Sequence, residues 1–154
     1  MMFNIIFAAV CISALLLFNK KTSFLRRGVC LSAVIFILLS VIGGRLLNFY
    51  SLIPFWDKIL HFISGFILAA VANALFARLG GDNLNKKLKS LFILFFTFAS
   101  ACVWEIYEFC GDILFGFSSQ GNSLSDTMID MIVGSISGLI YLLIFYIPDS
   151  KKFR

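Results

Sequence analysis

Long apolar runs recur along this chain, and they limit the possible folds more than any other feature. They lie at about residues 2–18, 28–49, 57–79, 91–114 and 127–147. A helix needs about 20 apolar residues to cross a hydrocarbon core of roughly 30 Å, and these runs are close to that length. The sequence therefore predicts an all-α, polytopic membrane bundle of five transmembrane helices, which form a single integral membrane domain over residues 1–154.

The composition agrees with this fold class. Hydrophobic residues make up 60% of the chain and charged residues only 14%, and the mean hydropathy is +0.98. No nucleic-acid-binding motif is visible, and the net charge of +5 belongs to short loops. The four cysteines, Cys11, Cys30, Cys102 and Cys110, fall inside apolar runs without a C-x-x-C pair. We expect them to pack as small hydrophobic side chains.

The basic residues predict an orientation in the membrane. Eleven of the thirteen Lys and Arg residues lie in three regions that alternate correctly to share one face. The three regions contain Lys20, Lys21, Arg26 and Arg27; Arg78, Lys86, Lys87 and Lys89; and Lys151, Lys152 and Arg154. By the positive-inside rule this face is the cytoplasm. We therefore expect the N-terminus outside and the C-terminus inside the bacterial cytoplasmic (inner) membrane. The first run lacks a basic n-region and a cleavage site, so we expect it to be retained as an anchor.

The acidic residues gather on the opposite side. Six of the eight are predicted at or below the outer face, and only Asp82 and Asp149 lie inside. Asp57 and Asp126 begin the third and fifth spans, where a carboxylate can accept backbone N–H bonds and complement the helix dipole. Capping is therefore a sufficient structural explanation for these two acids.

The remaining acids and the single histidine are predicted deeper in the membrane. His61 and Asp130 lie one turn, about 6 Å, below the acids that begin their helices. Glu105, Glu108 and Asp112 are spaced i, i+3 and i+7, which places them in one helical stripe. Glu105 should lie at the depth of His61 and Asp130. A carboxylate near mid-membrane costs about 2.5–3.5 kcal/mol, so Glu105 should face the bundle interior and be functional.

Two structural alternatives remain open at this point. His61 could be a core histidine that donates to a carbonyl, and Asp112 could be an interfacial acid. The predicted pocket as a whole comprises His61, Glu105, Glu108, Asp130, Asp57, Asp126, Asp112, Lys58 and Arg45.

The predicted pocket has an excess of negative charge. Six acids face Arg45 and Lys58, which leaves a formal charge of −4, or −3 with His61 protonated. Like charges this close cannot all ionise in a low dielectric, so some acids are protonated or a cation lies among them. The oxygen-rich set suits Mg²⁺, Ca²⁺ or Mn²⁺ better than zinc. The candidate metal ligands are His61, Glu105, Glu108 and Asp130.

Small residues are placed where these helices could approach one another. Gly134 and Gly138 lie four residues apart in the fifth span, with Ser135 and Ser137 between them, and Gly65 lies one turn beyond His61. Such faces let transmembrane helices pack closely. We expect them to hold the third, fourth and fifth spans together around the acids.

Three motifs on successive spans carry a resemblance to a known family. "WDKILHF", "WEIYEF" and "SQGNSLSDTMIDM" resemble the D-K-x-x-H-F, E-x-x-E and Q-G-(D/N)-x-x-x-D-T-x-x-D-M pattern of YjdF-like bacterial inner-membrane proteins. The chain is more distantly similar to VanZ-like proteins, but Glu108 and Gly134 replace the Gln and Asn of that pattern and its Arg is missing. The resemblance covers about residues 45–146. VanZ-like proteins are linked to glycopeptide (teicoplanin) resistance, so the resemblance implies work at the cell envelope.

Three classes of function fit these observations. The first is a binding or transport module for a cation, protons, or a cationic or lipid headgroup near the outer leaflet. The second is a membrane-embedded hydrolase or transferase that acts on a lipid-linked envelope substrate. The third is a structural or accessory membrane subunit whose acids are paired internally. The expected partner is the lipid bilayer, with no nucleic acid, and transport by so few helices would require a homo-oligomer.

Overall fold

The computed structural model describes residues 2–81, 84–121 and 123–146, and within these ranges it contains helices and no β-strand. Five helical segments are long and apolar enough to cross a membrane, so the all-helical, multi-pass fold class is confirmed. The elements are α1 (Met2–Thr22), α2 (Arg27–Ile37) continued by the π-helix η1 (Leu38–Leu46), α3 (Phe49–Leu52), α4 (Trp56–Arg78), α5 (Lys86–Phe115), and α6 (Leu124–Tyr141) continued by the π-helix η3 (Leu142–Tyr146). Asp82, Asp149 and the basic residues after residue 150 lie outside the described ranges.

Several helix boundaries differ from the predicted spans, and two of the differences have a clear local cause. α5 begins at Lys86 instead of residue 91, because the Asn85 side chain accepts a hydrogen bond of 2.8 Å from the Lys87 backbone N–H. This N-cap stabilises a polar first turn that hydropathy alone does not detect. The second span ends at Leu46 instead of residue 49, because Asn48 has a left-handed backbone with φ of 59°. An isolated residue in this conformation breaks a right-handed helix.

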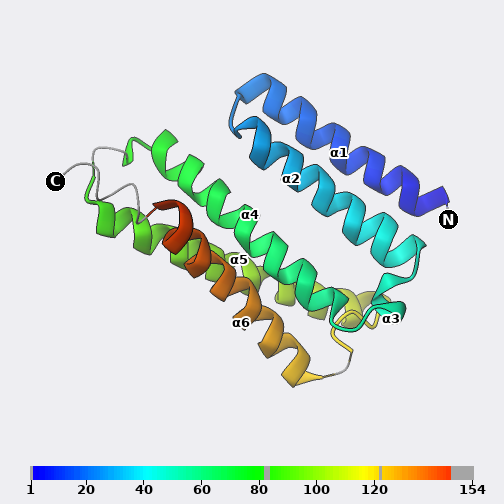
Figure 1. Ribbon diagram of the computed structural model, residues 1–154. Helices are drawn as coiled ribbons and strands as arrows, with labels where there is room; N and C mark the ends of the chain where they lie inside the picture. The colour runs from blue at the N-terminus through cyan, green and yellow to red at the C-terminus, as the bar shows by residue number, and fades with distance from the viewer. Residues whose placement is uncertain (1, 82–83, 122, 147–154) are drawn as a thin grey trace. The chain divides into compact units, whose positions relative to one another are not determined.

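The chain divides into two compact units, residues 1–60 and residues 61–154. In the first unit, α1 and α2 are antiparallel neighbours (Figure 1). Gly44 of η1 packs against the ring of Tyr50, where a Cβ atom would collide with that ring. Whether the two units form the single membrane domain expected from the sequence stays a prediction.

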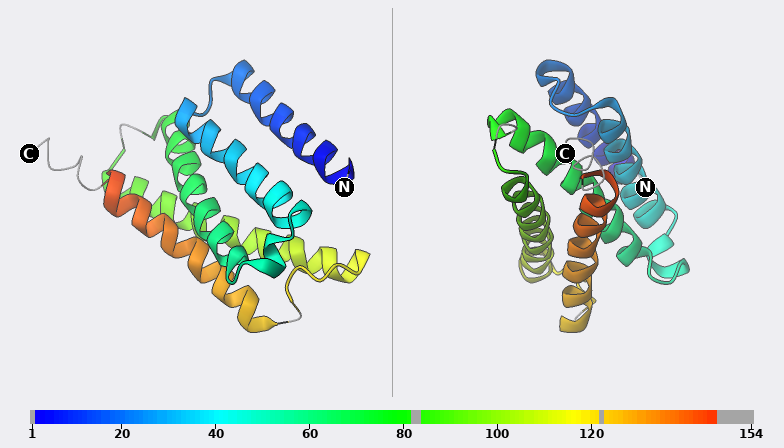
Figure 2. Two further views of the ribbon diagram at one scale, coloured as in Figure 1. Left: turned by 45° about the vertical axis from the view of Figure 1, so that its right-hand side comes forward. Right: turned by 60° about the vertical axis from the view of Figure 1, so that its left-hand side comes forward.

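The second unit consists of α4 from His61 onward, α5 and α6, which lie side by side (Figure 2). Each helix buries one stripe at helical spacing. The buried residues are His61, Gly65, Ala69, Ala72 and Phe76 on α4; Ile93, Thr97, Ala101 and Glu105 on α5; and Asp130, Gly134, Ser137, Gly138 and Tyr141 on α6. Most of these side chains are small or apolar, and the ionisable exceptions His61, Glu105 and Asp130 each lie at an end of their set. On α5, Gly111 is also buried but lies outside this regular spacing.

Glycines set the separation of these three helices. A Cβ atom at Gly65 would collide with the Gly134 carbonyl oxygen and the Ser137 hydroxyl oxygen. One at Gly138 would lie 2.9 Å from the Thr97 methyl carbon. The predicted role of Gly65, Gly134 and Gly138 as packing residues is therefore confirmed. Further along the bundle, Asn73 donates a 3.2 Å hydrogen bond to the Tyr141 hydroxyl and ties α4 to α6.

We predict that Gly65→Ala destabilises the protein by about 1–3 kcal/mol, the usual cost of overpacking a filled interface. The added methyl group must displace backbone of α6, which cannot move as a side chain can. Gly28→Ala in α2 is the matched control, because nothing lies within 4 Å of its Cβ position. Thermal unfolding in detergent should show a lower Tm for Gly65→Ala and an unchanged or slightly higher Tm for Gly28→Ala. Equal Tm values for Gly65→Ala and the wild type would contradict the packing described.

Candidate functional site

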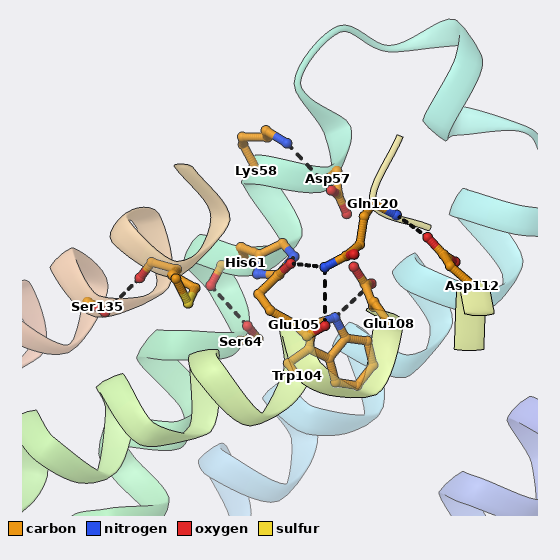
Figure 3. Close-up of polar contacts among 11 residues, drawn as sticks. Asp57, Lys58, His61, Ser64, Trp104, Glu105, Glu108, Asp112, Gln120 and Ser135 are labelled. Carbon is orange, nitrogen blue, oxygen red and sulfur yellow. Dashed lines mark hydrogen bonds and ion pairs between the residues drawn. The ribbon is translucent and has the colours of Figure 1, made fainter. Parts of the chain in front are cut away.

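His61 and Glu105 meet at one end of the three buried stripes (Figure 3). Both residues are buried, with 6% and 3% of their surface exposed. The His61 Nε2 atom lies 3.6 Å from Glu105 Oε1. This distance exceeds the usual range of a direct hydrogen bond, and the two groups form an ion pair only when His61 is protonated. α4 and α5 therefore place an imidazole and a carboxylate face to face within the bundle.

Glu108 lies one turn beyond Glu105 on the same side of α5 and is half-buried. The Trp104 indole N–H donates a 2.9 Å hydrogen bond to Glu108 Oε1 and fixes this carboxylate at the edge of the site (Figure 3). One ligand atom from each of His61, Glu105 and Glu108 lies within 4.8 Å of the other two. The structure thus brings together three of the four residues that the sequence proposes as metal ligands.

Asp130, the fourth predicted ligand, enters from α6. It is 2% exposed, and one of its carboxylate oxygens lies within 4.8 Å of a His61 ring nitrogen. The position of Asp130 follows from Gly134, which lies one turn further along α6. A Cβ atom at Gly134 would lie 3.3 Å from the Ala101 Cβ and 3.7 Å from the His61 carbonyl oxygen. This close contact draws the start of α6 against both other helices.

Asp112 has a structural role, which explains why an acid occupies this position in the stripe of Glu105, Glu108 and Asp112. α5 ends at Phe115 and is capped by Gly116, which has a φ of 68°, and the chain then turns back toward the helix. The Asp112 carboxylate accepts hydrogen bonds from the backbone N–H groups of Ser119, at 2.8 Å, and Gln120, at 3.1 Å. It therefore anchors the loop that connects α5 to α6, a role that the sequence did not indicate.

Gln120 is a site residue that the sequence reasoning did not include. Its side-chain amide donates to the Glu105 carbonyl oxygen at 3.2 Å and approaches Glu105 Oε2 at 3.5 Å (Figure 3). The only signal for Gln120 was the "QG" pair in the third motif. Neither hydropathy nor the spacing of charges detects this pair. Through Asp112 and Gln120, the loop after α5 is joined to the buried carboxylate.

The capping of α6 differs from the expectation. Ser123 is the N-cap, and its hydroxyl oxygen accepts a 3.3 Å hydrogen bond from the Asp126 backbone N–H. Asp126 lies three residues inside the helix, where its charge still complements the dipole, so it is not itself the cap.

Three predicted pocket residues belong to the first unit. Asp57 and Lys58 lie in the first turn of α4 with their charged atoms 3.6 Å apart, and Arg45 lies near the end of η1. Their membership of the pocket stays a prediction.

A cavity of about 560 Å³ adjoins Glu105 in the second unit. It lies between α5, α6 and the loop that Asp112 anchors. Its lining combines polar and apolar side chains from Cys102, Glu105, Ile106, Phe109, Asp112, Ile113, Gln120, Ser123, Leu124, Thr127 and Met131. Polar and apolar side chains therefore lie together beside the buried Glu105 carboxylate.

The fold and site define a class: helical, multi-pass membrane proteins with a histidine and carboxylates buried between their helices. Residues 1–151 match the family described as "Predicted membrane protein (DUF2238)", and the chain belongs to this family. A Thermotoga maritima protein described as "Uncharacterized protein" is 30% identical over 130 residues, which cover 83% of this chain and 66% of that protein. The match thus spans slightly less than two thirds of the relative's length. No solved structure matches the chain.

We predict that Asp112→Ala loosens the loop at residues 117–121, because both backbone N–H groups held by the carboxylate lose their acceptor. Limited proteolysis should cut this loop several-fold faster than in the wild type. Asp112→Asn retains one amide oxygen as an acceptor and should give an intermediate rate. Identical cleavage rates for Asp112→Ala and the wild type would show that the carboxylate does not hold the loop.

Proposed function

We propose that this protein binds a cation inside the membrane, at a site formed by His61, Glu105 and Glu108 with Asp130 beside them. The observation that carries the proposal is the buried Glu105 carboxylate, 3.6 Å from the chain's only histidine. An ionisable side chain within a transmembrane bundle marks an ion, proton or ligand site by default. Here such side chains come from three different helices and converge.

The spacing of these side chains suits a small metal ion. Two ligands that each lie about 2.1 Å from one ion, at right angles, are themselves about 3 Å apart. His61 Nε2 and Glu105 Oε1 are 3.6 Å apart, so a small rotation of either side chain would bring both into coordination. Carboxylate oxygens favour Mg²⁺, Ca²⁺ or Mn²⁺, and Mn²⁺ also accepts imidazole. In place of a metal ion, a proton or an organic ammonium group would meet the same negative charge.

A membrane-embedded hydrolase or transferase is the second candidate, and one observation favours it. The cavity of about 560 Å³ reaches Glu105, which also faces His61. An imidazole beside a carboxylate can exchange protons with a bound substrate in general acid–base catalysis. A purely structural role is supported for Asp112, which holds the loop, but it does not account for the convergence of buried groups around His61.

The setting we propose for this function is the cell envelope of a bacterium, with the N-terminus outside the cytoplasmic membrane and the C-terminus inside. The alternating basic regions support this orientation. The YjdF-like motifs agree with membership of a family of predicted membrane proteins, whereas the comparisons add no support for a VanZ-like activity.

A divalent cation should stabilise the folded protein against heat. A ligand that binds only the native state adds about 2.7 kcal/mol at a hundredfold excess over Kd, because unfolding must release it. Millimolar Mg²⁺, Ca²⁺ or Mn²⁺ should therefore raise the Tm in detergent, and Glu105→Gln should abolish most of this rise by removing a charged ligand.

Thr97→Val is the matched control for this experiment. Thr97 is also fully buried on the α5 stripe, two turns from Glu105, and its hydroxyl group donates to the Ile93 carbonyl oxygen of its own helix. The substitution can change the Tm itself but should leave the cation-induced rise intact. The metal site is wrong if no divalent cation raises the Tm, or if Glu105→Gln responds as fully as Thr97→Val.

A further inference from the structure

The cavity beside Glu105 has a chemically divided lining. One part is apolar and is formed by Ile106, Phe109, Ile113, Leu124 and Met131. Ile106, Phe109 and Ile113 are 60%, 52% and 66% exposed, although they belong to a helix that is apolar enough to cross a membrane. Exposed apolar faces of such helices contact lipid chains. The apolar part of the cavity therefore continues into a surface suited to an acyl or alkyl chain.

The other part of the lining is polar and negatively charged. Glu105 and Asp112 contribute carboxylates, and Gln120, Ser123 and Thr127 contribute amide and hydroxyl groups. The residues that line this cavity include no Lys or Arg. By charge complementarity, a cationic head group is favoured here over a phosphate or sulfate.

Glu105 is shared between the cavity and the cation site described above. Its Oε1 atom faces His61 at 3.6 Å, whereas its Oε2 atom faces Gln120, a cavity residue, at 3.5 Å. Figure 3 shows the carboxylate between these two side chains. A donor in the cavity can therefore reach one oxygen of Glu105 while the other remains directed toward His61.

From this geometry we infer that the cavity binds an amphiphile with a protonated amine head group. The ammonium group donates to Glu105 and is oriented by Gln120, and the hydrocarbon chain lies along Ile106, Phe109 and Ile113. This inference rests on the proposed function, because it uses the same carboxylate, and it adds both a head-group charge and a chain to the ligand.

The labelling rate of a cysteine in the cavity wall can measure whether a ligand occupies the cavity. Cys102 lines the cavity, whereas Cys110, on the same helix, is exposed and is not among the lining residues. Two single-cysteine proteins, each retaining one of these thiols, are labelled with monobromobimane in dodecyl maltoside. Dodecylammonium at ten times its Kd should slow the labelling of Cys102 about tenfold, because only about a tenth of the sites stay open. The labelling of Cys110 should not change.

Three comparison ligands separate the contributions of charge and chain. Dodecyl sulfate has the chain with the opposite charge, dodecanol has the chain without charge, and butylammonium has the charge with a short chain. Each should protect Cys102 far less than dodecylammonium at the same concentration. Equal protection by dodecyl sulfate or dodecanol would overturn the cationic head group, and equal protection by butylammonium would overturn the chain-binding cavity.

Two variants locate the head group. Glu105→Gln should abolish the protection of Cys102 by dodecylammonium. Gln120→Lys changes a loop residue, which folding should tolerate more readily, and it should also abolish protection because it places a positive charge beside Glu105. If Glu105→Gln does not fold, Gln120→Lys decides the point, and unchanged protection in that variant would overturn the inference.

The outcome separates this inference from the proposed function. If divalent cations raise the Tm but dodecylammonium does not protect Cys102, the inference is wrong and the cation site stands. If dodecylammonium protects Cys102 without any metal effect on the Tm, the ligand is an organic cation and the metal site is wrong. If neither effect is observed, both proposals are wrong.

Discussion

The close approach of α4, α5 and α6 is the constraint on which the rest of the second unit depends. Gly65 lies against the backbone of α6 at Gly134, and Gly138 lies against Thr97 of α5. Between helices in lipid there is little hydrophobic driving force, so van der Waals packing of small residues must supply the association. Each methyl group added at these positions pushes two helices apart, which also separates the groups that they carry.

The chemistry of the candidate site follows directly from this packing. The buried stripes of the three helices end in His61, Glu105 and Asp130, which are 6%, 3% and 2% exposed. Because the helices are in contact one turn below, these side chains have no room to diverge and are directed toward one another. In the proposed function, a bound cation would offset the cost of burying these ionisable groups away from water. The packing residues thus determine the geometry of the three ionisable side chains.

The sequence predicted the helices, and the shared helical level of His61, Glu105 and Asp130, because both depend on simple periodicities. Apolar runs identified the five segments that are long and apolar enough to cross a membrane. Helical spacing predicted one depth for His61, Glu105 and Asp130, and the depth itself stays a prediction. Features that depend on local hydrogen bonding escaped this reasoning. Ser123 caps α6 ahead of Asp126, and Gln120 returns to Glu105 only because Asp112 folds the loop back. No pattern of charge or hydropathy predicts that this loop folds back onto Glu105.

The central claim is that His61 and Glu105 coordinate one cation, and electron spin echo spectroscopy of bound Mn²⁺ tests it most directly. The chain has a single histidine, so protein purified without a histidine tag can give imidazole ¹⁴N modulation from one residue alone. If His61 and Glu105 share one cation, the wild type should show one such nitrogen coupling, His61→Gln should lose it, and Thr97→Val should keep it. Bound Mn²⁺ without nitrogen coupling, or with coupling that survives His61→Gln, would contradict this claim.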